Sequence, residues 1–253
     1  MLSAITRKPS TSLSNCELTF VEREAINYKK ALAEHDAYER VLEKLGCRVI
    51  SLPAEEDYPD SVFVEDTAVI LPEVAVLMSP GAESRRGEVD LIEPTLSELR
   101  DIVRISPPAY IDGGDVLTVD KSVFVGQSTR TNRAGFESFA SILQPLGYSV
   151  IPVKVTGALH LKSACAALDD KTLLVNPEWL DVSHFKEFRI LEVREPFASD
   201  CLHIDKTIVL DESFVETIRH VRESGFKVET IDVSQFGKME AGLTCLSLIF
   251  DAA

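Results

Sequence analysis

The chain repeats one order of elements: a helical segment, a short strand, and then two apolar strands separated by a polar turn. This order recurs about five times, with a period of roughly 40 residues. The last expected strand, 244–250, has no hairpin partner after it, and a strand at 2–7 could supply that partner. Repetition of this kind predicts an α/β protein whose units are arranged radially around a centre.

The positions of the elements follow from hydrophobic periodicity and turn residues. Helices are expected at 21–45, 89–99, 133–146 and 212–224. Strands are expected at 48–52, 61–64, 67–71, 74–78, 102–105, 116–119, 123–125, 149–155, 159–168, 173–175, 201–204, 208–210 and 227–233. The alternative architecture is an open, doubly wound sheet. No phosphate-binding motif supports it, since neither GxGxxG nor GxxxxGKS/T follows an expected strand.

Composition excludes several classes of function. The 253 residues include 26 basic and 41 acidic side chains, a formal charge of −15, which argues against nucleic acid as a partner. No apolar run approaches the roughly 18 residues of a membrane span, and the polar start does not resemble a secretion signal. The five cysteines are scattered without metal-ligand spacing. We therefore expect free thiols in a reducing cytoplasm.

A few polar residues interrupt apolar runs, where side chains are buried. Cys245 follows Leu243-Thr244, His160 stands between two leucines, and the pair Glu65-Asp66 follows Val-Phe-Val. A thiol, an imidazole and carboxylates are together the groups of a cysteine enzyme that attacks a cationic carbon. Each also has a structural interpretation, because a buried thiol packs as a small hydrophobe, a histidine forms a core hydrogen bond, and acids flank turns.

Six motifs, in their order and spacing, resemble the dimethylarginine dimethylaminohydrolase family. They are 59–66 (PDSVFVED), 80–86 (PGAESRR), 112–115 (DGGD), 130–132 (RTN), 159–162 (LHLK) and 243–245 (LTC). The resemblance covers essentially the whole chain. It implies the pentein fold, a five-bladed α/β propeller with its active site in the central channel, and a single catalytic domain over residues 1–253.

The resemblance also implies roles for the polar residues. Cys245 is the expected nucleophile, His160 the proton donor and acceptor, and Asp112 the acid that orients the histidine. Glu65 and Asp66 are expected to hold the guanidinium. If both lie on a strand, their side chains point to opposite sides, so one of them would contribute through its backbone or from a bulge.

The amino-acid end of a substrate has its own expected contacts. Arg85 and Arg130 match the family's carboxylate-binding positions, and Arg86 could exchange roles with Arg85. A guanidinium fork suits a carboxylate better than lysine does. The α-ammonium group is expected to contact Asp60 and the backbone of Leu18 and Met239.

The implied reaction is hydrolysis of Nω-methylated arginines to citrulline and dimethylamine or methylamine, through a covalent cysteine intermediate. Phe63 and neighbouring apolar side chains are expected to accept the methyl groups. Two alternatives remain open: another guanidino or ureido amino-acid hydrolase, such as an arginine deiminase or a citrulline hydrolase, and a non-catalytic pentein binding protein. No metal or cofactor is expected. The expected partner is a small cationic substrate, without nucleic acid or membrane, and a homodimer is left open.

Overall fold

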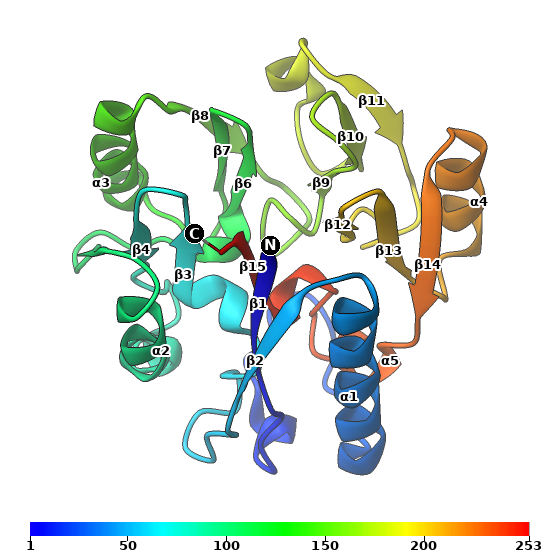
Figure 1. Cartoon of the computed structure of the whole chain (residues 1–253), viewed down its shortest axis with the longest axis horizontal. Helices are drawn as coiled ribbons and strands as arrows, with labels where there is room; N and C mark the ends of the chain where they lie inside the picture. The colour runs from blue at the N-terminus through cyan, green and yellow to red at the C-terminus, as the bar shows by residue number, and fades with distance from the viewer. Residues whose placement is uncertain (253) are drawn as a thin grey trace.

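Five small sheets surround a common centre (Figure 1) in a computed structural model that describes residues 1–252. In each sheet the middle strand pairs antiparallel with one neighbour and parallel with the other. The helices lie on the outside of the sheets (Figure 1). This arrangement is the five-bladed α/β propeller that the resemblance implies.

The sheets take their strands from the chain almost in order. Their members are β15–β1–β2 (Leu248–Asp251, Leu2–Arg7, Arg48–Leu52), β3–β4–β5 (Ala68–Ile70, Ala75–Leu77, Ile102–Arg104), β6–β7–β8 (Val116–Val119, Ser122–Gln127, Ser149–Lys154), β9–β10–β11 (Cys165–Ala167, Thr172–Val175, Arg189–Glu192) and β12–β13–β14 (Leu202–Ile204, Thr207–Asp211, Lys227–Ile231).

A helix connects the two parallel strands in four of these sheets, because parallel neighbours need a long crossover. The connecting helices are α1 (Tyr28–Lys44), α2 (Glu88–Ser97), α3 (Arg133–Leu143) and α4 (Val215–Glu223). In the β9–β10–β11 sheet, the crossover contains only a 3₁₀ turn at Val182–Phe185. A short helix, α5 (Ser234–Gly237), follows β14 and leads to the segment that precedes Cys245.

The first helix begins later than its sequence predicts. Apolar residues from position 21 suggested a helix over 21–45, but α1 starts at Tyr28. Asn27 forms its N-cap, since the side-chain oxygen accepts a hydrogen bond from Lys30 N. At the other end Gly46 has a φ of +94°, the left-handed conformation in which glycine commonly ends a helix. Residues 21–27 are therefore left in the loop before the helix, close to the site described below.

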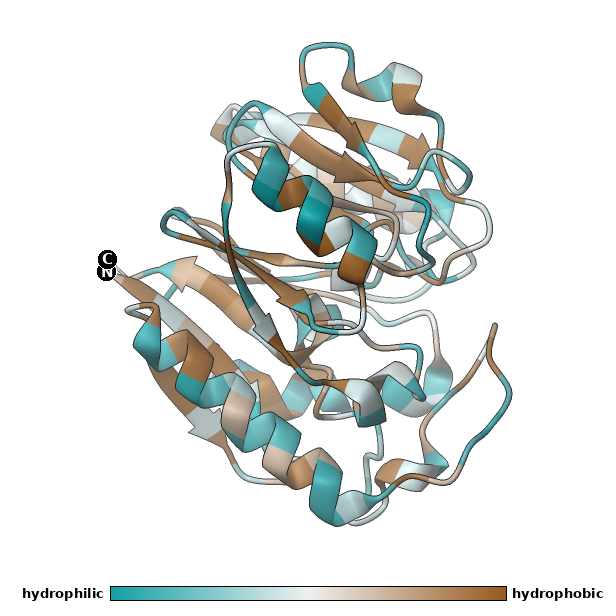
Figure 2. Ribbon diagram, turned by 90° about the vertical axis from the view of Figure 1, so that its right-hand side faces the viewer, coloured by the Kyte–Doolittle hydropathy of each residue, from teal (hydrophilic) through white to brown (hydrophobic). Residues whose placement is uncertain are grey.

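The two ends of the chain close the ring. β1 pairs antiparallel with β15, with Leu2 opposite Asp251 and Ile5 opposite Leu248, which confirms the predicted partner of the last strand. The N- and C-termini consequently lie side by side on one face of the molecule (Figures 1 and 2). The first blade is thus built from residues at opposite ends of the sequence.

At the centre of the ring, one expected strand is wrong and two are correct only over part of their length. Residues 61–64 form no strand, and Val64–Thr67 is a 3₁₀ turn. Of 159–168 only Cys165–Ala167 is a strand, and Thr244–Leu246 is a 3₁₀ turn before β15. The runs are apolar because the centre is buried, and apolar character alone does not distinguish a strand from a buried turn.

Apolar residues are concentrated on the strands and on the inner stripes of the helices (Figure 2). Along α1 the buried positions Ala31, His35, Tyr38 and Leu42 recur at three- and four-residue steps. Buried clusters of this kind join each sheet to its covering helix and to the next sheet. Among the described residues, none of the helices has the length and apolar character needed to cross a bilayer.

Candidate active site

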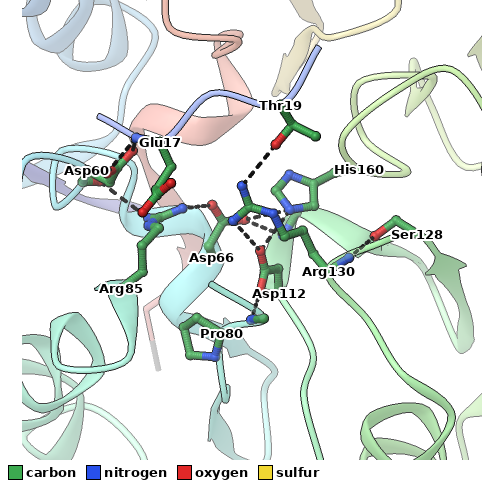
Figure 3. A network of polar contacts seen from close by, with 12 residues as sticks. Glu17, Thr19, Asp60, Asp66, Pro80, Arg85, Asp112, Ser128, Arg130 and His160 are labelled. Carbon is green, nitrogen blue, oxygen red and sulfur yellow. Dashed lines mark hydrogen bonds and ion pairs between the residues drawn. The ribbon is translucent and has the colours of Figure 1, made fainter. Parts of the chain in front are cut away.

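The central turns bring together polar groups from distant parts of the chain. The turns Val64–Thr67, Gly113–Asp115 and Thr244–Leu246 each lead into the first strand of a hairpin or into β15. The turn that contains His160 precedes β9 in the same way. Because the blades are related by rotation, these equivalent turns all point toward the axis. Asp66, Asp112 and His160 therefore lie at one place despite their separation in the chain (Figure 3).

His160 is held by carboxylates. Its Nε2 lies 2.9 Å from Asp112 Oδ2 and 3.8 Å from Asp66 Oδ1. Burial alone would lower the pKa of the imidazole, but Asp66, Asp112 and Asp115 outweigh this effect and raise the pKa to about 9. His160 is therefore an imidazolium at neutral pH.

Gly114 allows this close assembly. A Cβ at this position would stand 2.6 Å from His160 Nδ1 and 2.7 Å from Asp66 Oδ1, closer than any side chain tolerates. The Gly114 amide donates to Asp66 Oδ1 at 3.0 Å. The glycine thus lets the backbone approach both side chains directly. The Asp112-Gly113-Gly114-Asp115 motif therefore needs a residue without a side chain at position 114 as well as its acidic residues.

Asp66 stays ionised in this buried position. Burial would raise its pKa, but His160 and Arg85 outweigh it and hold the pKa at about 2. Arg85 Nη1 lies 2.5 Å from Asp66 Oδ2. Asp112 is completely buried and accepts a further hydrogen bond from Gly81 N at 2.8 Å. Asp66 thus provides negative charge on one side of the site, where the backbone amide of Gly81 also holds Asp112 in place.

Glu65 points in a different direction from its neighbour Asp66. Its Oε1 lies 2.6 Å from Lys162 Nζ, and its Oε2 accepts from Thr244 Oγ1 at 3.1 Å. Since both acids lie in a 3₁₀ turn, the alternation expected of a strand does not apply. Lys162 belongs to the LHLK motif, yet its pairing with Glu65 was not foreseen from sequence. Glu65, Lys162 and Thr244 also line a cavity of about 650 Å³ that extends toward the chain termini.

Cys245 is 8% exposed and lies in the turn beside Thr244. Burial raises the pKa of its thiol well above the ordinary value, and the charges of Glu65, Asp200 and Asp66 raise it further. These effects keep the sulfur protonated at neutral pH. A cation bound beside it would reverse part of this effect by attracting the thiolate.

Asp200 is a residue of the site that sequence reasoning missed. Its carboxylate accepts from Thr244 N at 2.9 Å and from Thr244 Oγ1 at 3.1 Å, so it fixes the turn that carries Cys245. A Cβ at Gly242 would stand 2.2 Å from Asp200 Cγ. Burial raises the pKa of Asp200 to about 7, and the nearby Glu65 charge contributes. Asp200 belongs to none of the recognised motifs, and no local signal marks it.

The two expected carboxylate-binding arginines differ in their surroundings. Arg85 is buried and donates to Glu88, Asp66 and the backbone oxygens of Asp60 and Phe63, which leaves one Nη1 hydrogen unassigned. Arg130 is more loosely held. Its Nη1 lies 4.0 Å from Asp112 Oδ2, and its Nη2 donates to Thr19 Oγ1 at 3.4 Å (Figure 3).

Arg86, the alternative to Arg85, turns elsewhere. Its guanidinium carbon lies 4.4 Å from the centre of the Tyr110 ring, and its Nε donates to Pro80 O. Arg85 and Arg130 are therefore the arginines that face the central acids (Figure 3).

The remaining expected contacts lie where residues 16–21 cross the site. Asp60 accepts from Glu17 N at 3.2 and 3.1 Å, and burial raises the pKa of its carboxyl. Leu18 is half-buried against the cluster that contains Phe63, Met239 and Cys245. Phe63 is itself turned into this core, with its ring 6.4 Å from that of Phe236.

Within residues 1–252, two clusters have donor atoms close enough to share a metal ion: Asp66, Asp112 and His160, and a second set on α1, His35, Asp36 and Glu39. In the first, the imidazolium and Arg85 already neutralise the carboxylates. In the second, Lys8 Nζ lies 2.8 Å from Asp36 and 2.7 Å from Glu39. Positive side chains thus take the place that a cation would fill in either cluster.

Comparison with known proteins agrees with the motifs. A family model described as eukaryotic N,N dimethylarginine dimethylhydrolase matches residues 4–193. The N(G),N(G)-dimethylarginine dimethylaminohydrolase of Pseudomonas aeruginosa is 34% identical over 97% of this chain and 98% of its own length. The protein of the same name from Streptomyces coelicolor is 36% identical over 97% and 95%, respectively.

Solved structures give the same result. The P. aeruginosa enzyme, as a cysteine-to-serine mutant complexed with citrulline, superposes with a TM-score of 0.94 at 33% identity, covering 99% of this chain and all of that one. The N-terminal domain of ArgZ shares the fold with a TM-score of 0.89, at 17% identity over 98% of this chain and 97% of that one. By sequence and by fold, the chain belongs to the dimethylarginine dimethylaminohydrolase family.

Proposed function

We propose that this protein hydrolyses Nω-methylated arginines to citrulline, with release of dimethylamine or methylamine, and that Cys245 is the nucleophile. The observation that carries the proposal is a buried thiol whose pKa is raised by the charges of Glu65, Asp200 and Asp66, together with a protonated His160 3.8 Å from Asp66. Negative charge gathered around a thiol in this way suits a planar cation. The names of the two bacterial relatives and the citrulline complex of the similar structure support the same substrate class.

The first chemical step would begin when substrate binds. The guanidinium would offset the negative charges that raise the pKa of Cys245 and so allow the thiolate to form. The sulfur would then attack the central guanidinium carbon and form a tetrahedral adduct. As that adduct collapses, the bond to the methylated nitrogen breaks, and His160 gives its proton to the departing amine. The product of this step is a covalent thiouronium on Cys245.

The second step would release citrulline. His160, now neutral, takes a proton from water, and the resulting hydroxide attacks the thiouronium carbon. The carbon–sulfur bond then breaks, the hydroxyl proton of the adduct passes to the departing sulfur, and Cys245 is regenerated as the thiol while the ureido group of citrulline remains. Asp112 would hold the imidazole in place through both steps, since its carboxylate is buried and bonded to Gly81 N as well as to Nε2.

Other parts of the site would bind the amino-acid end and the methyl groups. Arg130 has few fixed partners and can reorient toward an α-carboxylate, with the last Nη1 hydrogen of Arg85 beside it. The α-ammonium would lie near Asp60 and the backbone of Leu18 and Met239. Phe63 belongs to the same apolar cluster as Cys245 and would contribute to the surface that contacts the methyl groups. Five free thiols are in keeping with a cytoplasmic location, which we propose together with a homodimeric assembly.

A parallel assay with four substrates tests this function. Asymmetric dimethylarginine, monomethylarginine, arginine and citrulline are each incubated with the protein, and the ureido product and the released amine are both quantified. We expect the highest kcat/KM for a methylated arginine, because apolar contact with a methyl group contributes about 1–3 kcal/mol. Faster release of ammonia from arginine would identify a deiminase, and ornithine from citrulline would identify a citrulline hydrolase.

The same assay tests the nucleophile. Cys245→Ser should lose nearly all turnover while it keeps the unfolding curve of the parent protein. Cys16→Ser is the matched control, since Cys16 is also buried, and burial with the nearby Asp60 charge raises the pKa of its thiol to about 11. A haloacetamidine should label Cys245 in the parent and nothing at Cys16. Parent-like turnover by Cys245→Ser would show that another group attacks the substrate.

A further inference from the structure

We infer that Glu240 is a positioning residue that fastens residues 17–21 onto the loop that carries the nucleophile. Its carboxylate accepts hydrogen bonds from three successive backbone amides: Thr19 N at 2.8 Å, Val21 N at 2.6 Å, and Phe20 N between them. The donors and the acceptor are about 220 residues apart in sequence. This contact therefore joins the start of the chain to the segment that ends at Cys245.

Burial and backbone conformation mark Glu240 as more than a surface acid. It is 7% exposed, although glutamate is rarely buried without a partner. Its φ of +57° is left-handed, a conformation that costs a residue with a side chain free energy. A single carboxylate accepts hydrogen bonds from all three amides, and such charge-assisted bonds are stronger than neutral ones. Without the carboxylate, these amides would form hydrogen bonds to water instead.

Neighbouring side chains extend the same attachment. Lys238 Nζ donates to Ala25 O at 3.1 Å, and Gln235 Oε1 accepts from Asn27 N at 2.8 Å. Helix α5 and the residues after it thus contact the backbone of 19–27 at several points. On the other side, Asp60 holds Glu17 N. We call residues 17–21 the crossing segment, since they are held from both sides above the site.

The consequence for binding rests on the proposed function. The two backbone groups expected to contact the α-ammonium belong to Leu18 and Met239, and each is one residue from a contact made by Glu240. Thr19 also accepts the hydrogen bond from Arg130. Because Glu240 holds Thr19 against the loop, it sets the distance between the backbone groups of Leu18 and Met239. It also sets the position of Arg130, which donates to Thr19. It governs the amino-acid end of the substrate and leaves the attack on the guanidinium carbon unaffected.

Hydrogen exchange on the substrate-free protein tests the contact directly. The variants are Glu240→Gln, which preserves shape, and Glu240→Ala; the control is Glu22→Gln, which removes an equal charge from an exposed position nearby. We expect the protection of amides 19–21 to fall about tenfold or more in both Glu240 variants, and to stay at the parent value in the control. Unchanged protection in Glu240→Ala would overturn the inference.

Kinetics test the consequence separately. In Glu240→Gln, KM for dimethylarginine should rise about tenfold, while kcat changes by less than about threefold, because ordering of the bound amino acid is lost and the chemistry is not. Labelling of Cys245 by a haloacetamidine, which has no amino-acid end, should keep its rate. A fall in kcat and in labelling together would indicate general damage to the nucleophile loop and contradict the assigned role. If the parent does not hydrolyse dimethylarginine, the proposed function fails, but the exchange result still decides the contact.

Discussion

His160 shows how a single residue acquires a charge that its sequence context does not suggest. Between two leucines it would be expected to be neutral, yet in the folded chain three aspartates outweigh the cost of burial. The aspartates come from two other central turns, at positions 66, 112 and 115. An imidazolium is what the first proposed step needs, since a proton must be ready for the leaving amine.

The stability of the protein should depend on pH through this residue. The pKa of His160 rises from 6.5 to about 9 on folding, so its contribution is complete below pH 6.5 and is lost as the pH rises through 9. The full contribution is roughly 3 kcal/mol, at about 1.4 kcal/mol per pKa unit. Urea unfolding at pH 6 and pH 9.5 measures it. The parent should lose more stability over this range than His160→Asn does.

Asp112→Asn tests whether the carboxylate of Asp112 contributes to the raised pKa of His160. Loss of the charged partner should lower the pKa of His160 and move the decline in kcat/KM to lower pH, with the imidazole titration followed by NMR. Glu137→Gln, on the exposed face of α3, is the control and should leave the titration unchanged. An imidazole that titrates near 6.5 in the parent would contradict the assigned charge.

At the scale of elements, the short turn that carries Cys245 is stabilised from outside. It has no side-chain cap of its own, and Asp200 supplies the acceptors for Thr244. The acceptor comes from the segment before β12, in the adjacent blade. The orientation of the nucleophile thus depends on how two blades pack together.

Gly242→Ala should disturb this turn. The added Cβ would stand 2.2 Å from the carboxylate of Asp200, so either the turn or the acid must move. We expect a loss of about 1–3 kcal/mol in the free energy of unfolding. We also expect kcat to fall by about 100-fold, because a displacement of this size misaligns the sulfur. Gly237→Ala is the matched control, since open space surrounds that position. Equal kinetics in the two variants would show that the turn tolerates the shift.

At the scale of the whole molecule, the ring is closed by the contact between β1 and β15. Cys245 lies in the turn directly before β15, so the closing blade also carries the proposed nucleophile. Ile5, on the middle strand of this blade, is completely buried against residues of the neighbouring blade such as Val64 and Ala68. The stability of the turn that contains Cys245 therefore depends on the pairing of the N-terminal strand β1 with β15.

Ile5→Ala should destabilise the entire protein. Truncation of a fully buried isoleucine costs about 2–5 kcal/mol, measured here as a shift of the urea midpoint. Val103→Ala, on the outer strand β5 with its side chain 37% exposed, should change stability by less than about 0.5 kcal/mol. Accelerated labelling of Cys245 by a thiol reagent should accompany the loss in Ile5→Ala. Similar midpoints for the two variants would mean that closure contributes little.

The sequence by itself determined the repeat, four of the five helices, most strands and the partner of the last strand. These follow from hydrophobic periodicity and turn residues, which act over a few neighbouring positions. The motifs also led to the family and to the residues placed at the centre. The start of α1 was missed because residues 21–27 form a loop, from which the apolar Ile26 packs against the core without continuing the helix.

Only the tertiary structure decided how those residues meet. The pairing of Glu65 with Lys162 and the contact of Asp200 with Thr244 both join segments far apart in sequence. The same is true of Glu240 and the crossing segment. A buried carboxylate must find donors wherever the fold brings them, and the low dielectric of the centre then sets its charge and that of His160. The residues next to a side chain in sequence therefore do not indicate which distant residues it contacts in the folded protein.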